Sequence, residues 1–257
     1  MGVVNLTPDS FSDGGQFVDS QVAIQHAFKL IKDGADIVDL GAESTRPGAE
    51  PLHPDEELAR LVPVLEAIQD AGVAVSVDTR HAETMRAVLR YSVDLINDVN
   101  GFRAPGAVEA VSGSSAGVCV MHMAGDPLTM QEDPAYRSVV SEVAGFLHDR
   151  VDVLRSSGVS ANRLIVDPGI GFGKKLAHNL ELLGSIRQIS VTTDCPVLIG
   201  LSRKSMLGEM TGRPVDERLA ASIGGALAAV QNGASILRVH DVAQTRDALT
   251  VFTRMTA

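Results

Sequence analysis

The stretch Val75-Ser76-Val77-Asp78 ends an apolar run in a carboxylate, and a helix-like segment from Glu83 to Leu89 follows it. The same unit recurs in seven further apolar runs that lead to polar residues: Val3-Val4, Ile37-Val38, Leu95-Ile96, Val118-Cys119-Val120, Leu164-Ile165-Val166, Val197-Leu198-Ile199 and Ile236-Leu237. Short runs rich in Val and Ile, bounded by Gly, Asp or Asn, are typical of strands buried on both faces of a parallel sheet. Eight such units predict an α/β fold, a (β/α)8 TIM barrel, whose chemistry gathers at the carboxyl ends of the strands.

Helix-like segments alternate with these runs and support the same prediction. They cover Gln21 to Lys32, Glu56 to Gln69, Glu83 to Leu89, Val139 to Leu154, Asn179 to Ile189, Arg218 to Val230 and Ala243 to Thr253, with a short helix expected near Gly106 to Val111. In the second segment Leu58, Leu61 and Leu65 lie on one helical face, and Pro63 predicts a kink or a break. Glycines follow four of the segments at the expected left-handed closing position: Gly34, Gly72, Gly158 and Gly233.

Size and composition indicate one barrel domain. A length of 257 residues matches a single (β/α)8 barrel, and no Pro/Ser-rich or charged linker divides the chain, so we expect one domain over residues 1–257. The formal net charge of −10 argues against nucleic acid as a partner. Two cysteines, Cys119 and Cys195, make no disulfide framework and suit a reducing cytoplasm. Because no apolar stretch approaches the roughly 20 residues that span a bilayer, we expect a cytoplasmic protein with no membrane partner.

Two long connections follow the first and second strands, from about Thr7 to Asp19 and from about Ser44 to Pro54. Connections of this length on the catalytic face of a barrel are usually mobile lids or substrate clamps. We therefore expect both to cover the site.

Carboxylates and an amide stand at three strand ends: Asp78 after the third run, Asn97 after the fourth and Asp167 after the sixth. A carboxylate that accepts paired hydrogen bonds can recognise a flat heterocycle through its amino group and a ring N–H. A single aspartate at such a place is more often a helix cap or half of a salt bridge. Three such groups on one rim favour ligand recognition.

The segment Asp167-Pro168-Gly169-Ile170-Gly171-Phe172-Gly173-Lys174-Lys175 lacks the spacing of a P-loop and the GxGxxG order of a dinucleotide site. Its glycines instead allow the backbone to approach a flat ligand closely. Phe172 is either a stacking residue for that ligand or ordinary packing, and the sequence leaves both interpretations open.

Cationic groups follow the seventh and eighth runs, at Ser202-Arg203-Lys204 and at Arg238 and His240. Phosphate sites of these barrels often lie in the loops after the same two strands, which favours a phosphoryl or pyrophosphoryl group here. Lys204 could alternatively form a Schiff base, as in an aldolase. A Mg²⁺ ion held mainly by a diphosphate needs one oxygen ligand from the protein, for which Asn5 is a candidate.

Several longer stretches resemble dihydropteroate synthases: Asn5 to Gly15 (NLTPDSFSDGG), Glu43 to Gly48 (ESTRPG), Asp167 to Lys174 (DPGIGFGK), Ser202-Arg203-Lys204 and Arg238-Val239-His240. The resemblance runs from residue 1 to the end of the chain, and the first stretch is highly specific. Enzymes of this family join 6-hydroxymethyl-7,8-dihydropterin diphosphate to p-aminobenzoate, giving 7,8-dihydropteroate and pyrophosphate in folate biosynthesis, and sulfonamides compete for the p-aminobenzoate position. The resemblance thus implies a transferase with Mg²⁺ as cofactor and a homodimer.

The resemblance also implies a role for each matching residue. Asp78, Asn97, Asp167 and Lys204 would bind the pterin, with Met123 nearby; Asn5, Arg238 and His240 would hold the diphosphate, with Asn5 also on Mg²⁺; and Thr45, Arg46, Pro47, Phe172, Ser202 and Lys204 would surround p-aminobenzoate. Catalysis would fall to Asp78, Lys204, Arg238 and His240, with the acids on one side of a common mouth and the cations facing the leaving anion on the other. Two rivals are a pterin-binding methyltransferase domain and a pterin-binding paralogue without turnover.

Overall fold

The computed structural model describes residues 1–6, 16–44, 51–125, 130 and 134–256. Its strands are β1 (Gly2–Asn5), β2 (Ile37–Gly41), β3 (Ala74–Asp78), β4 (Leu95–Asp98), β5 (Gly117–Met121), β6 (Leu164–Asp167), β7 (Leu198–Ile199) and β8 (Ile236–Leu237). All paired neighbours run parallel; β1 to β6 form one sheet in chain order, and β7 pairs with β8. These strands are the eight apolar runs of the sequence, in the predicted order.

Two backbone bridges join the sheet and the β7–β8 pair into a closed ring. A parallel bridge between Val166 and Val197 links β6 to the residue before β7, and another between Gly2 and Val239 links β1 to the chain just after β8. The second junction is reinforced by hydrogen bonds from Val3 N to Val239 O (3.1 Å) and from Val239 N to Met1 O (2.9 Å). The fold is therefore the predicted (β/α)8 barrel.

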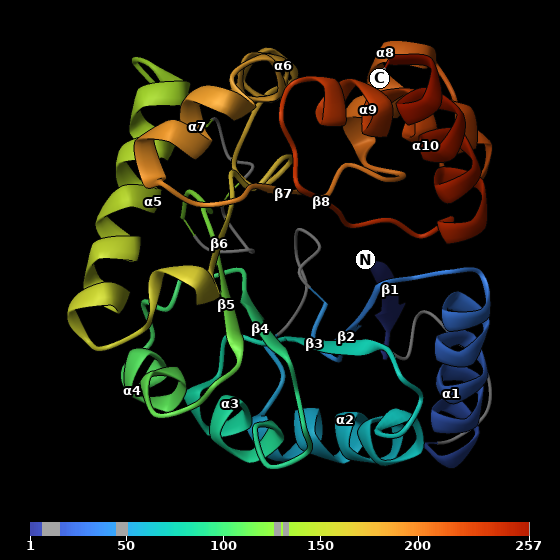
Figure 1. Cartoon of the computed structure of the whole chain (residues 1–257), viewed down its shortest axis with the longest axis vertical. Coiled ribbons are helices and arrows are strands. Elements are labelled where there is room, and N and C mark those ends of the chain that lie inside the picture. The colour runs from blue at the N-terminus through green and yellow to red at the C-terminus, as the bar shows by residue number, and fades with distance from the viewer. Residues whose placement is uncertain (7–15, 45–50, 126–129, 131–133, 257) are drawn as a thin grey trace.

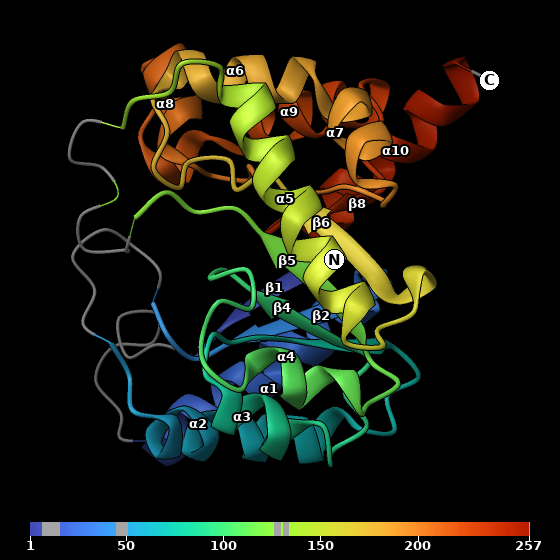
Figure 2. The same cartoon turned by 90° about the vertical axis from the view of Figure 1, so that its left-hand side faces the viewer.

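The helices surround this ring (Figure 1). They are α1 (Gln16–Lys32), α2 (Pro54–Ile68), α3 (Ala82–Val88), α4 (Ala107–Ser112), α5 (Val139–Ser156), α6 (Leu176–Gly184), α7 (Ile186–Thr193), α8 (Ser205–Thr211), α9 (Leu219–Gln231) and α10 (Val242–Thr256), with 3₁₀ turns at Ala161–Arg163 and Val215–Glu217. Figure 2 shows α1 to α4 along one side of the barrel and α6 to α10 along the other. Within the described residues no helix is long and apolar enough to cross a membrane.

The helix boundaries confirm most of the sequence predictions and correct three. The break allowed for at Pro63 is wrong, because α2 continues through it while burying Leu61 and Leu65 against the barrel. The single helix expected from Asn179 to Ile189 is two helices, which meet at Ser185. Helix α8 after Lys204 was not predicted. The four closing glycines all have positive φ as expected, at 90°, 69°, 93° and 106° for Gly34, Gly72, Gly158 and Gly233.

Side-chain alternation along the strands builds the interior of the barrel in layers. Successive strand residues point to opposite sides of the wall, so every second residue faces inward. The lower interior layer is apolar, and its members are Met1, Ile37, Leu95, Cys119, Ile165, Leu198 and Ile236. Two residues further along, the interior side chain is polar in four cases: Asp39 follows Ile37, Asn97 follows Leu95, Asp167 follows Ile165 and Arg238 follows Ile236. A polar layer therefore lies on an apolar floor, toward the carboxyl ends of the strands.

Candidate active site

Three members of the polar layer are almost completely withdrawn from solvent. Asp39 is 0% exposed, Asn97 4% and Asp167 6%. Two of the layer's oxygens, Asp39 Oδ1 and Asn97 Oδ1, are buried without a hydrogen-bond partner in the described part of the chain. Leaving a buried acceptor unpaired costs about 1–3 kcal/mol. A ligand that brings N–H donors into the barrel mouth would recover part of that cost.

Arg238 lies at the centre of this layer, between two carboxylates. Its Nε donates to Asp39 Oδ2 at 2.6 Å and its Nη2 to Asp78 Oδ2 at 3.1 Å. Burial lowers the pKa of Arg238, but the attraction of Asp39 and Asp78 outweighs burial, so the net pKa is raised. The expected separation of acids from cations across the mouth is therefore wrong for Arg238, because its guanidinium donates to the carboxylates of both Asp39 and Asp78.

Burial also governs the charge of Asp78. It raises the pKa of that carboxyl to about 8; Arg238 opposes the shift, and the neighbouring carboxylates of Asp39 and Asp98 add to it. The Arg238 guanidinium is attracted by three carboxylates, those of Asp39, Asp78 and Asp167. The free site can hold a proton on Asp78 near neutral pH, and a ligand rich in donors would favour the ionised form.

Asp167 begins the glycine-rich loop after β6 and is tied to it. Its Oδ1 accepts a hydrogen bond from Gly169 N at 2.7 Å. Burial raises the pKa of Asp167 while the Lys204 ammonium opposes the shift; burial lowers the pKa of Lys204 to about 8 while Asp167 opposes that shift. Lys204 Nζ donates to the carbonyl oxygen of Ile170 and lies 4.6 Å from the centroid of the Phe172 ring.

Phe172 packs against buried side chains, which is one of the two interpretations that the sequence left open; its stacking on a ligand stays a prediction. Its ring packs against a cluster of buried side chains that includes Met123, the others being Val99, Met121 and Met130. The same ring faces the Lys204 ammonium, a cation–π arrangement. The predicted residues Phe172, Lys204 and Met123 are therefore brought together on the β5–β7 side of the mouth.

Ser202 and His240 meet after β7 and β8. Ser202 Oγ lies 3.1 Å from His240 Nδ1 and accepts a hydrogen bond from His240 N at 3.3 Å. Burial, and after it the guanidinium groups of Arg203 and Arg238, lower the pKa of His240 to about 4. His240, which the sequence places with the cations, is therefore neutral at pH 7 in the free site.

The remaining predicted residues divide into two groups. Asn5 is the last residue of β1 and is half-buried. The pairing with β2 extends one residue beyond it, because Leu6 N donates a hydrogen bond to Gly41 O at 2.7 Å. Thr45, Arg46 and Pro47 lie outside the described residues, as do most of the two long connections. Among described residues no group of three or more His, Cys, Asp or Glu side chains could hold a metal ion by itself.

Sequence reasoning missed two buried charged residues at the site. Asp39 lies inside an apolar run rather than at its end, yet it stands two residues after Ile37 just as Asp167 stands two after Ile165, and that spacing could have identified it. Lys174 was treated only as part of a glycine-rich motif, and it is 4% exposed. No pattern in the sequence distinguishes it from the adjacent exposed Lys175.

Comparisons with known proteins show the family of the chain. A sequence model of the family described as "Pterin binding enzyme" matches residues 1–240. The dihydropteroate synthase of Haemophilus influenzae is 46% identical over 253 residues, which cover 98% of this chain and 92% of the relative. That of Escherichia coli K12 is 43% identical over 252 residues, which cover 98% and 89%.

Solved structures show the same relationship. A dihydropteroate synthase of Xanthomonas albilineans with 4-aminobenzoic acid has a TM-score of 0.94 and 44% identity, with 100% of this chain and 92% of that chain covered. The enzyme of Burkholderia cenocepacia complexed with 7,8-dihydropteroate has a TM-score of 0.89 and 46% identity, with 100% and 90% covered. This chain therefore belongs to the pterin binding enzyme family and, within it, to the dihydropteroate synthases.

Proposed function

We propose that the chain is a transferase that condenses 6-hydroxymethyl-7,8-dihydropterin diphosphate with p-aminobenzoate to give 7,8-dihydropteroate and pyrophosphate. The observation that carries the proposal is the buried polar layer at the barrel mouth, with unpaired acceptors on Asp39 and Asn97. It occurs in a chain 46% identical to a structure complexed with 7,8-dihydropteroate. The same likeness extends to a Yersinia pestis synthase solved with a sulfonamide drug, at 40% identity, which makes sulfonamide binding part of the proposal.

Two carboxylates and an amide at the barrel mouth bind the pterin ring. Asp78, Asn97 and Asp167 each offer an acceptor to the amino group and ring N–H donors of the heterocycle. Hydrogen bonds from a ligand stabilise the ionised carboxylates, whose pKa values burial has raised for Asp78 and Asp167. Met123, which is 2% exposed, supplies apolar contact beside Lys204 and Phe172.

The diphosphate is held at the β1 and β8 side of the mouth by Asn5, Arg238 and His240. Arg238 can meet the anion only with the donors that Asp39 and Asp78 leave available, so it acts as a fixed, pre-oriented charge. His240 is neutral before substrate binds, and a nearby diphosphate would raise its pKa and favour proton uptake.

The donor set fits a Mg²⁺ ion that arrives with the diphosphate. Mg²⁺ is commonly bound through one or two protein oxygens together with substrate phosphates. Asn5 at the end of β1 can supply one amide oxygen, and no larger cluster of ligands exists among the residues described. The ion, when bound, would neutralise charge that develops on the leaving group.

The acceptor amine approaches from the side of Phe172, Ser202 and Lys204, with Thr45, Arg46 and Pro47 completing that side. An aromatic amine is a modest nucleophile, so we propose that the C–O bond to the diphosphate breaks well before the amine attacks. Arg238 and His240 then face the departing anion, while Asp78 and Asp167 stabilise positive charge on the pterin. Such preorganised groups are often the largest single contribution to catalysis.

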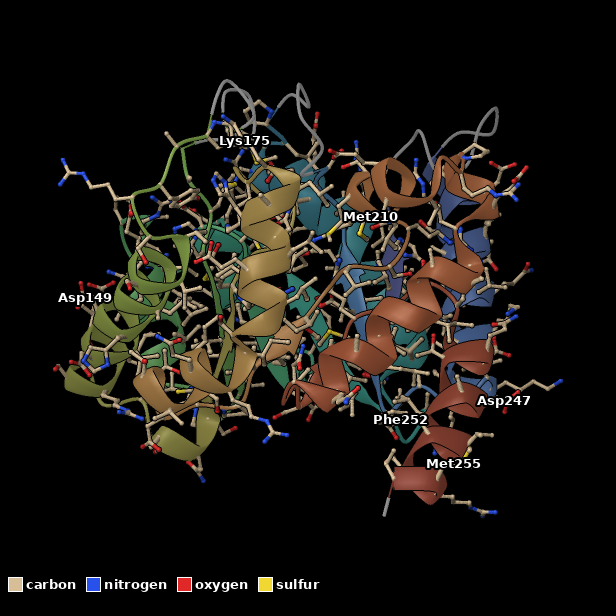
Figure 3. All side chains as sticks on the ribbon, turned by 90° about the horizontal axis from the view of Figure 1, so that it is seen from above. Asp149, Lys175, Met210, Asp247, Phe252 and Met255 are labelled. Atoms are coloured by element: carbon tan, nitrogen blue, oxygen red, sulfur yellow. The ribbon has the colours of Figure 1, made fainter. Side chains whose placement is uncertain are left out.

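The chain is proposed to work as a cytoplasmic homodimer of single-domain subunits. Both cysteines are buried free thiols, as expected in a reducing compartment. Helix α10 exposes Val251 (57%) and Met255 (80%), which suits burial against a second subunit. Figure 3 shows Phe252 and Met255 on the opposite side of the molecule from Lys175. A solution mass of 27.0 kDa by light scattering would contradict the dimer.

The decisive assay is pyrophosphate release. Protein incubated with the pterin diphosphate, p-aminobenzoate and Mg²⁺ should release pyrophosphate in proportion to the 7,8-dihydropteroate formed. A pterin-binding methyltransferase domain or a paralogue without turnover releases none. Omission of p-aminobenzoate serves as the control for simple hydrolysis of the diphosphate.

A further inference from the structure

Lys174 is a buried charge to which the proposed reaction assigns no role. It follows the last glycine of the loop after β6 and is 4% exposed. Its Nζ lies 3.0 Å from His122 Nδ1, 3.4 Å from the His122 carbonyl oxygen and 2.9 Å from the Phe172 carbonyl oxygen. An ammonium group has three N–H donors, and these three acceptors match them.

Burial makes the charged form of this lysine less stable than it would be in water. Burial lowers the pKa of Lys174 to about 7, although the carboxylate of Asp167 opposes the shift. Burial also lowers the pKa of His122 to about 3, and the Lys174 ammonium lowers it further, so the ring is neutral and its Nδ1 can accept. A methionine would fill similar space without desolvating a charge. Lysine therefore differs from methionine at this position by the hydrogen bonds that it donates to His122 and to the Phe172 carbonyl oxygen.

Those groups belong to two different strand ends. His122 directly follows β5, and Phe172 lies in the loop after β6. The two segments are already in close contact, because a Cβ atom on Gly169 would lie 1.9 Å from the His122 carbonyl oxygen. Tyr136 Oη donates to Gly173 O at 2.9 Å and holds the end of the same loop. Lys174 thus fixes the backbone at Phe172 between these two attachments.

The fixed backbone presents two groups to Lys204. The carbonyl oxygen of Ile170 accepts a hydrogen bond from Lys204 Nζ, and the Phe172 ring lies 4.6 Å from the same atom. A shift of the backbone at Phe172 would move the ring away from Lys204. Lys174 Nζ donates a 2.9 Å hydrogen bond to the Phe172 carbonyl oxygen and so restrains this backbone.

We propose that Lys174 is a positioning residue, which holds the backbone of Phe172 so that its ring stays against Lys204 on the p-aminobenzoate side of the site. The inference rests on the proposed function, since it is through Phe172 and Lys204 that Lys174 reaches the acceptor substrate. Lys174 itself touches neither substrate.

The test is a double-mutant cycle with steady-state kinetics for both substrates. K174M removes all three donors at similar length, and we expect the KM for p-aminobenzoate to rise at least tenfold while the KM for the pterin diphosphate changes less than threefold. K174Q, which keeps two N–H donors, should give an intermediate rise. In the F172A background K174M should have less than a threefold effect, because the residue through which it acts is gone. K175M, the same change at the exposed neighbour, is the control and should stay within twofold.

The possible outcomes distinguish failure of the positioning role from failure of the proposed function. An equal rise in both KM values, an unchanged KM for p-aminobenzoate, or full additivity of K174M with F172A would overturn the positioning role. If K174M does not give a cooperative thermal transition, K174Q alone and in the F172A background carries the same test. Absence of pyrophosphate release from the wild-type protein would contradict the proposed function instead.

Discussion

Replacement of Asp39 by Asn removes one of the two carboxylates that hold Arg238, and we expect it to destabilise the fold by about 3 kcal/mol. Asp39 is 0% exposed, and its Oδ2 lies 2.6 Å from Arg238 Nε. Breaking a buried ion pair by removal of one partner typically costs about 3–5 kcal/mol. The lower end applies here because Asp78 remains 3.1 Å from Arg238 Nη2 and still compensates part of its charge.

The matched control is the same substitution at Asp36, three residues earlier in the chain. Asp36 Oδ1 pairs with Arg246 Nη1 at 3.2 Å, but the two side chains are 81% and 55% exposed. Exposed pairs of this kind contribute about 0–1 kcal/mol. D36N therefore applies the same chemical change to an arginine–aspartate pair in water, and its effect should be small.

Urea unfolding at pH 7, followed by circular dichroism, measures both variants against the wild-type protein. The free energy of unfolding should fall by about 3 kcal/mol in D39N and by less than about 1 kcal/mol in D36N, with similar m-values. A D39N variant within about 1 kcal/mol of D36N would refute the reasoning. It would mean that Asp78 alone holds Arg238 and that Asp39 is not structurally required.

Three further predictions follow from the charges at the mouth. R238A and D78N should each remove about 2–4 kcal/mol of transition-state stabilisation, which lowers kcat/KM roughly 30- to 900-fold. Near-wild-type turnover in a folded variant would refute those roles. Burial raises the pKa of Asp78 to about 8, so titration calorimetry should show the affinity for 6-hydroxymethylpterin falling as the pH drops from 9 to 6, and D78N should lose most of that dependence. Burial lowers the pKa of His240 to about 4, so diphosphate binding at pH 6 should take up a proton, seen as a buffer-dependent binding enthalpy; equal uptake by H240N would contradict this assignment.

The strand pattern was sufficient to predict the barrel and the level of the site within it. Asp39, Asn97, Asp167 and Arg238 each stand two positions after an apolar floor residue, and this period of two is visible without coordinates. Helix ends were less predictable. The division at Ser185 depends on how α6 and α7 pack against the barrel, which local hydrophobic spacing does not encode.

The pairing of the charges could not be predicted from spacing alone. Asp39 and Arg238 are 199 positions apart, and only closure of the ring between β8 and β1 places them 2.6 Å from each other. For the same reason the sequence separated acids from cations, whereas the structure inserts Arg238 between Asp39 and Asp78. The hydrogen bonds of Lys174 could not be predicted either, because its acceptors come from two different loops.

In the proposed function the interior polar layer receives the pterin ring. A crystal structure of this protein with 7,8-dihydropteroate tests it most directly. We expect ring nitrogens within hydrogen-bond distance of Asp78, Asn97 and Asp167, with the benzoate end lying past Phe172. A ring bound outside the barrel mouth, or one that leaves the Asn97 carboxamide and the Asp167 carboxylate without ligand contacts, would contradict it.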